Sequence, residues 1–143
     1  MFKTLTDTML VASQICVDDI ARASALGVTT IINNRPDGES PDQTAGAEIA
    51  AVATAAGIAY VAIPVTHAGF SMPQIKAMAA AMTATKGKVL AYCRSGTRST
   101  NLWALAQAGS GVDPEQLSRA AASAGYDLAP LRTMMDMLGS QNE

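Results

Sequence analysis

Short runs of apolar residues alternate along the chain with longer segments in which apolar and polar positions recur at helical spacing. The runs at residues 28–33, 58–65 and 88–93 are rich in β-branched and aliphatic side chains, which predicts buried strands. A fourth apolar run, at residues 9–15, predicts an edge strand. Residues 34–43 contain two prolines and a glycine, so we predict a loop there.

Capping residues mark the starts of the helices between these strands. Ser71, with Gln74 three positions later, forms a capping-box pattern, and Asp113 followed by Pro114 is a strong helix start. Asp18 is expected to cap the first helix. The expected helices are residues 19–26, an alanine-rich segment ending near 56, 71–85, 99–108, a segment opening at 113, and 129–138, followed by a polar tail at 139–143.

Strands and helices that alternate in this way form a mainly parallel central sheet with helices on both faces. No linker, repeat or low-complexity run divides the chain. We therefore predict a single α/β domain over residues 1–143. A chain of 143 residues can bury a core without needing disulfides or a metal ion.

Composition and charge narrow the classes of function. With 49% hydrophobic and 15% charged residues the chain is not expected to be disordered, and a net charge of −2 argues against nucleic acid as a partner. No apolar stretch approaches the length of about 18 residues that spans a membrane, and the N-terminus lacks a secretory signal pattern. Two cysteines are too few for a disulfide scaffold, so we expect free thiols and a cytoplasmic protein.

The clearest chemical signal lies between residues 89 and 99. A buried strand ends at Cys93, four residues follow, and Arg98 stands at the start of the next helix. Ligands of parallel sheets bind at the carboxyl ends of the strands. The backbone N–H groups of this loop can converge on an anion, because Gly96 permits the necessary angles and the helix adds its positive end. Arg98 can complete this nest with a planar fork of donors.

The positive potential of such a nest favours the thiolate form of Cys93, which is the nucleophilic form. We predict that Cys93 and Arg98 are catalytic and that an anion is bound by Arg94, Ser95, Gly96, Thr97 and Ser99. Arg94 either attracts the anion or is a solvated loop residue. Thr97 and Ser99 can reach the sulfur with their hydroxyl groups, or Ser99 can serve only as a helix cap. No His/Cys cluster has metal-ligand spacing, so neither a metal nor a cofactor is expected.

The segment from Cys93 to Ser99 resembles the active loop of cysteine-dependent phosphatases and of rhodanese-type sulfurtransferases. Residues 28–39, 60–65 and 93–99, together with Ser13-Gln14, are similar to the phosphatase-like domain associated with beta-lactamase-like hydrolases. The resemblance covers about residues 2–109. It implies a cysteine-phosphatase-like α/β fold, and it suggests a persulfide-oxidising metallo-beta-lactamase-like hydrolase as a partner.

Two departures from the phosphatases favour sulfur transfer. Four residues separate Cys93 from Arg98, as in rhodanese-like loops, where cysteine phosphatases have five. Residues 66–71 lack the aspartic acid that small dual-specificity phosphatases use as a general acid. We therefore predict a sulfurtransferase with a Cys93 persulfide, which moves sulfur from thiosulfate or a small persulfide to a thiol acceptor. The alternatives are a phosphatase that acts on phosphate esters through a phosphocysteine, and a catalytically weak anion-binding module.

Other polar residues are expected at the same edge of the sheet. Arg35 can contact the anion and Asp37 or Glu39 can replace the missing acid, or the three can simply shape a turn. His67, the single histidine, can donate a proton or lie on the surface. Cys16 is expected to be a small buried residue rather than a resolving thiol.

Overall fold

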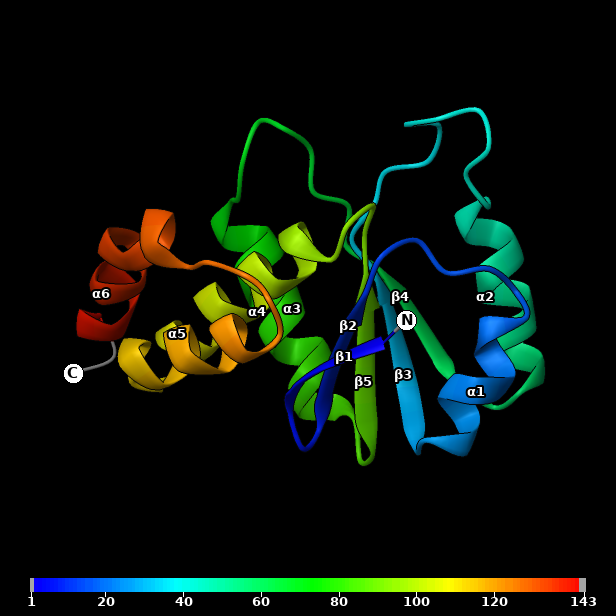
Figure 1. Ribbon diagram of the computed structural model, residues 1–143, viewed down its shortest axis with the longest axis horizontal. Helices are drawn as coiled ribbons and strands as arrows, with labels where there is room; N and C mark the ends of the chain where they lie inside the picture. Colours follow the sequence, from blue (N-terminus) through cyan, green and yellow to red (C-terminus); the bar gives the residue numbers. More distant parts are fainter. Residues whose placement is uncertain (1, 142–143) are drawn as a thin grey trace.

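Five strands form one sheet in the computed structural model, which describes residues 2–141. The strand order is β1-β2-β5-β3-β4 (Figure 1). β1 pairs antiparallel with β2, and every other pair of neighbours is parallel. The mainly parallel sheet is therefore confirmed. The strands are β1 (Phe2–Thr6), β2 (Met9–Ala12), β3 (Val28–Asn33), β4 (Ala59–Ala62) and β5 (Lys88–Tyr92).

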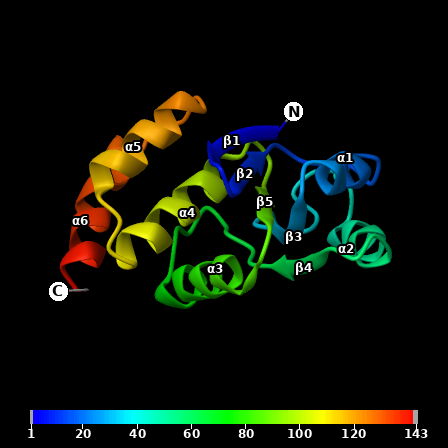
Figure 2. The same cartoon turned by 90° about the horizontal axis from the view of Figure 1, so that it is seen from below.

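Helices cover both faces of the sheet, as the alternating pattern predicts. One face carries α1 and α2, and the other carries α3 and α4, with α5 and α6 packed outside α4 (Figure 2). The described residues thus form one small α/β domain. The helices are α1 (Asp19–Ala25), α2 (Gly46–Ala55), α3 (Met72–Ala84), α4 (Thr97–Gly109), α5 (Pro114–Ser123), the 3-10 turn η1 (Ala129–Leu131) and α6 (Arg132–Ser140).

Alternate residues of the central strands supply two separate hydrophobic cores. On β5, Val89 and Ala91 belong to the core beneath α3 and α4, while Leu90 and Tyr92 belong to the core beneath α1 and α2. Successive side chains of a strand point to opposite faces, so a strand covered on both sides must be apolar throughout. This requirement explains why the segments from which β3 and β5 were predicted are mostly apolar, although β3 also contains Thr29, Thr30 and Asn33.

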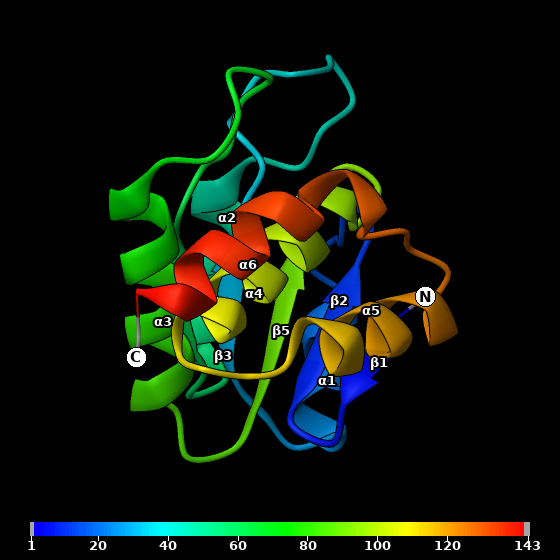
Figure 3. The same ribbon diagram turned by 90° about the vertical axis from the view of Figure 1, so that its left-hand side faces the viewer.

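α4 lies in the centre of the larger core, with α5 and α6 on its outer side (Figure 3). Eight of its 13 residues are buried, because the sheet and three helices surround it. Small side chains let the neighbouring backbones come close: Ala104, Ala106 and Ala108 are buried, and a Cβ on Gly139 of α6 would lie 3.6 Å from the Ala108 carbonyl oxygen. The alanine-rich composition serves this close packing.

The sequence-based strand predictions differ from the structure at the edges of the sheet. The prediction of an edge strand at residues 9–15 is wrong, because β2 ends at Ala12 and lies between β1 and β5. β1 is the true edge, and its pattern is too polar to stand out, with Leu5 its only fully buried residue among 2–6. The run at residues 58–65 forms only the four-residue strand β4, an edge strand with partly or fully exposed side chains.

Helix caps follow the sequence signals in two places out of three. The capping box is present, since the Ser71 N–H donates to Gln74 Oε1 at 2.8 Å and the Gln74 N–H donates to Ser71 Oγ at 3.4 Å. Asp113 caps α5 with its side chain. Asp18 makes no capping hydrogen bond, so that prediction is wrong; Asp19 instead accepts a backbone N–H from the segment before α1.

The C-terminal segment is more helical than predicted. The single helix expected at residues 129–138 is the turn η1 followed by α6, and α6 continues to Ser140. The expected polar tail therefore begins inside a helix, and residues 142–143 lie outside the described part of the chain. Within residues 2–141, no helix is long and apolar enough to cross a membrane.

Replacing Leu105 by alanine tests the packing of α4. Leu105 is fully buried, so Leu105→Ala is expected to lower the free energy of unfolding by about 2–5 kcal/mol. Leu26→Ala is the matched control, because Leu26 is 45% exposed and the same change there is expected to cost less than about 0.5 kcal/mol. Urea unfolding of both variants measures the difference, and equal losses would contradict the buried position of α4.

Candidate functional site

The Cys93 loop, defined here as residues 93–96, joins β5 to α4 at the carboxyl edge of the sheet (Figure 1). Cys93 is fully buried, and its Sγ accepts a hydrogen bond from the Gly96 N–H at 3.1 Å. Gly96 has φ +89° and ψ −10°, a left-handed conformation that returns its N–H towards the sulfur. The predicted nucleophile therefore lies before the positive end of a 13-residue helix, with a backbone donor on its sulfur.

The hydroxyl groups near the loop are arranged differently from the prediction. α4 begins at Thr97 with Gly96 as its N-cap, so Ser99 lies inside the first turn and is not the cap. Ser99 Oγ is buried and has no hydrogen-bond partner among residues 2–141. Thr97 Oγ1 accepts from Ser95 Oγ at 3.0 Å. In the described part of the chain, neither Thr97 nor Ser99 is hydrogen-bonded to the sulfur.

Arg98 is held along one edge of its guanidinium group. Nη1 donates to Glu39 Oε2 and to the Val65 carbonyl oxygen, both at 2.7 Å, and Nη2 donates to Glu39 Oε1 at 2.8 Å. An arginine has five N–H donors, so Nε–H and the second hydrogen of Nη2 remain. These two donors form the other edge of the fork, which can bind two oxygens of an anion side by side. The pKa of Arg98 is raised, chiefly by its hydrogen bonds to Glu39, with a smaller effect of Cys93.

Glu39 joins Arg98 to a second, buried arginine. Arg35 Nε donates to Glu39 Oε1 at 2.9 Å, and the side chain of Arg35 is only 4% exposed. The hydrogen bonds from Arg98, followed by those from Arg35, lower the pKa of Glu39 from 4.5 to about 2. Glu39 is therefore ionised at neutral pH and cannot act as the substitute acid. Arg35 also donates from Nη1 to Gln14 Oε1 at 3.0 Å and from Nη2 to Ser40 Oγ at 3.4 Å, so these contacts and Glu39 hold its buried side chain in place.

The other candidate residues do not converge on the sulfur. Asp37 accepts the N–H of Gly46 at 2.9 Å and so binds the first residue of α2. His67 and Arg94 are both exposed on loops, and Figure 1 shows these loops rising at the same edge of the sheet. Cys16 is exposed, so the expectation of a small buried residue is wrong. Its backbone N–H donates to Asp19 Oδ2 at 2.9 Å, in the loop that joins β2 to α1.

Tyr126 contributes to the site although the sequence does not point to it. Its Oη donates to the Ser95 carbonyl oxygen at 3.0 Å, and a Cβ on Gly96 would collide with the same Oη. Burial raises the pKa of Tyr126 and the charge of Cys93 adds to this effect, so the hydroxyl keeps its proton at neutral pH. Tyr126 follows α5 in the chain, and nothing in its local sequence indicates a contact with a loop 31 residues away.

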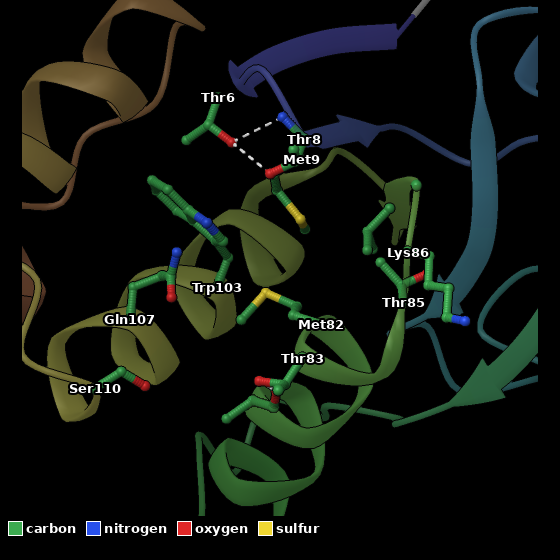
Figure 4. A pocket seen from close by; sticks show the side chains of 13 residues that line it. Thr6, Thr8, Met9, Met82, Thr83, Thr85, Lys86, Trp103, Gln107 and Ser110 are labelled. Carbon is green, nitrogen blue, oxygen red and sulfur yellow. Dashed lines mark hydrogen bonds between the residues drawn. The ribbon is translucent and has the colours of Figure 1, made fainter.

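A separate cavity of about 280 Å³ lies at the opposite end of the sheet (Figure 4). The turn between β1 and β2, the end of α3 and the face of α4 with Trp103 surround it. No residue of the Cys93 loop lines this cavity, so it is not part of the candidate site. Among residues 2–141, no group of three or more His, Cys, Asp or Glu side chains is placed to hold a metal ion.

Comparison with known proteins identifies the family. The model for the family described as "Beta-lactamase hydrolase-like protein, phosphatase-like domain" matches residues 1–110. The chain belongs to this family. A "Beta-lactamase hydrolase-like protein" of Xylella fastidiosa (strain 9a5c) is 31% identical over 133 residues, which make up 92% of this chain and 31% of that protein. The chain therefore spans about a third of the length of this curated relative.

Solved structures agree with this assignment. A Neisseria meningitidis protein described as a candidate phosphatase superposes with a TM-score of 0.82 at 30% identity, covering 95% of this chain and 96% of its own. The structure of PTPMT1 has a TM-score of 0.77 at 13% identity, covering 99% and 96%, and shows the shared fold alone. The chain thus has a phosphatase-like fold of cysteine-dependent enzymes. These names favour the phosphatase alternative over sulfur transfer.

The pH dependence of stability tests the ionised state of Glu39. Its pKa of about 2 in the fold lies below the ordinary 4.5, so the carboxylate stabilises the fold above pH 4.5, and this contribution is lost as the pH falls from 4.5 towards 2. Glu39→Gln is expected to be less stable than the wild type by about 1–3 kcal/mol at pH 7. The difference should shrink when unfolding by urea is measured at progressively lower pH in this range.

Glu115→Gln is the control for this measurement. Glu115 is 58% exposed and pairs with Arg132 on the surface, so its change is expected to cost less than about 1 kcal/mol at every pH. If Glu39→Gln matched Glu115→Gln at neutral pH, the bridge between Arg35 and Arg98 would not contribute to stability.

Proposed function

We propose that the chain is a sulfurtransferase in which the Cys93 thiolate carries sulfur as a persulfide. The observation that carries this proposal is that, among residues 2–141, neither of the acids expected beside the thiol is available to give a proton. Glu39 is ionised between two arginines, and Asp37 is engaged with the start of α2. A reaction with a good leaving group suits such a site, because sulfite or a thiolate departs without a proton. The four-residue spacing between Cys93 and Arg98 supports the same choice.

In the first step, the Cys93 thiolate attacks the outer sulfur of thiosulfate or of a small persulfide. A new S–S bond forms to Cys93, the old S–S bond breaks, and sulfite or a thiolate leaves with the electron pair. The free edge of Arg98 is suited to the oxygens of the departing anion, because Nε–H and Nη2–H lie side by side. The N–H of Gly96 and the positive end of α4 favour the thiolate that starts the reaction.

In the second step, the thiolate of an acceptor attacks the terminal sulfur of the Cys93 persulfide. The acceptor gains that sulfur, and Cys93 leaves as the thiolate, so no oxidant or reductant is consumed. Cys93 is fully buried, so each reactant requires a local opening at the Cys93 loop. Burial also protects the persulfide from bulk water and from chance thiols between the two steps.

Phosphate-ester hydrolysis is the second candidate, and a specific observation favours it. The family description and the Neisseria meningitidis relative both refer to phosphatases. The Cys93 thiolate would attack phosphorus, the ester oxygen would leave, and water would then release phosphate from the phosphocysteine. The leaving alkoxide needs a proton. Glu39 is ionised and Asp37 binds the N–H of Gly46, so of the three acids that the sequence suggests, the exposed His67 is left for this role.

The name of the curated relatives supports a proposal about the partner. Those relatives are named "Beta-lactamase hydrolase-like protein", and this chain covers about a third of one of them. We therefore propose a metallo-beta-lactamase-like hydrolase that oxidises persulfides as a partner that consumes the persulfide product.

Cys93→Ser tests the nucleophile. The variant is expected to lose sulfur transfer from thiosulfate to cyanide almost completely, because serine does not form a persulfide. Cys16→Ser is the matched control and should keep the activity, since Cys16 is an exposed thiol outside the Cys93 loop. A mass spectrum after thiosulfate treatment should show one added sulfur on Cys93. Efficient hydrolysis of an aryl phosphate without sulfur transfer would overturn the main proposal in favour of the phosphatase.

Arg98→Lys tests whether the Nε–H and Nη2–H donors of Arg98 bind the anion. Lysine keeps the positive charge but lacks the paired Nε–H and Nη2–H donors, so kcat/KM is expected to fall by about 10²- to 10³-fold. Arg119→Lys, on the exposed side of α5, is the control and should leave kcat/KM unchanged. Full activity in Arg98→Lys would mean that charge alone, and not the fork geometry, binds the anion.

A further inference from the structure

One peptide group lies between Cys93 and Tyr126. The N–H of Gly96 donates to Cys93 Sγ at 3.1 Å, and the carbonyl oxygen of Ser95 accepts from Tyr126 Oη at 3.0 Å. The carbonyl of Ser95 and the N–H of Gly96 belong to the same planar trans peptide, so they point in opposite directions. The Tyr126 hydroxyl therefore binds the carbonyl oxygen of this peptide, while the N–H of the same peptide contacts the sulfur of Cys93.

Tyr126 is fixed in place before it meets the loop. α5 ends with Gly125 in the left-handed conformation at φ +95°. The Gly125 N–H donates to the Ala122 carbonyl at 3.0 Å and the Tyr126 N–H donates to the Ala121 carbonyl at 2.9 Å, which is the Schellman pattern of a helix end. The ring also lies 4.8 Å from Lys3 Nζ, a cation–π contact with β1. The end of α5 and the contact with Lys3 thus hold Tyr126 in the position from which its hydroxyl reaches the loop.

The peptide between Ser95 and Gly96 has an alternative orientation. The φ of +89° and ψ of −10° at Gly96 match the third residue of a type II turn, and rotating that one peptide plane gives the angles of a type I turn. The rotation would turn the Gly96 N–H away from the sulfur and bring the Ser95 carbonyl oxygen towards it. A carbonyl oxygen beside a thiolate is unfavourable, so the orientation of this peptide affects how readily Cys93 ionises.

We infer that Tyr126 is a positioning residue, which keeps the Gly96 N–H directed at Cys93 by holding the Ser95 carbonyl from outside. The hydrogen bond from Oη also polarises the peptide, which strengthens the donor at its other end. Tyr126 lies beyond residues 1–110, the part that the family model matches. The segment that follows α5 therefore takes part in the chemistry of the site. This inference rests on the proposed function in that Cys93 must act as a thiolate.

Tyr126→Phe removes the hydroxyl and keeps the ring. The experiment follows alkylation of Cys93 by iodoacetamide as a function of pH, in a Cys16→Ser background because Cys16 is exposed. The loss of one net hydrogen bond is expected to lower the alkylation rate below neutral pH by about 2- to 10-fold. It is also expected to move the half-maximal pH upward by up to about one unit. The kcat/KM for sulfur transfer should fall in parallel.

Tyr60→Phe is the matched control. The Tyr60 hydroxyl accepts from Asn33 and not from the Cys93 loop, so its loss should leave the alkylation profile unchanged. An unchanged profile in Tyr126→Phe would overturn the inference. Faster alkylation at every pH would also overturn it, because the hydroxyl would then only cover the thiol. Alkylation needs no turnover, so this result stands even if the protein proves to transfer no sulfur.

Discussion

The carboxylate of Glu39 is the interaction on which the candidate site depends. It joins the segment after β3 to the start of α4, two parts of the chain 59 residues apart. Arg35 is almost fully buried, and a buried guanidinium group requires a counter-charge. Glu39 supplies that charge and at the same time fixes Arg98. Without the carboxylate, one arginine would be buried unpaired and the other would be free to turn away from the sulfur.

Backbone dipoles and the charged side chain of Arg98 have different roles in the candidate site. The N–H of Gly96 and the positive end of α4 act on the sulfur. Arg98 keeps two N–H donors for an anion, because Glu39 and Val65 occupy only three of its five donors. This arrangement is suited to the proposed binding of an oxyanion next to a thiolate, two negative groups that would otherwise repel each other.

The features predictable from the sequence are those that depend on neighbouring residues. β3 and β5 were recognisable because burial on both faces forces an apolar run, and the Cys93 loop because a strand, a cysteine and an arginine follow in a fixed order. β1 and the roles of Glu39 and Tyr126 depend on pairing across the fold. The Thr and Lys residues of β1 give it the polar pattern of a loop. Glu39 stands among turn residues and Tyr126 follows a helix, and the local sequence of neither residue predicts its distant partner.

The phosphatase-like fold and the proposed sulfur chemistry are compatible because both reactions share their first requirement. Each needs a thiolate beside an oxyanion at the end of a parallel strand, and the fold supplies this through the Cys93 loop and Arg98. The reactions differ in what the leaving group needs. An alkoxide needs a proton, whereas sulfite does not, and here the carboxylate best placed to give one is bound by two arginines. The choice between the two activities therefore lies with Glu39 and its partners, outside the loop that carries the nucleophile.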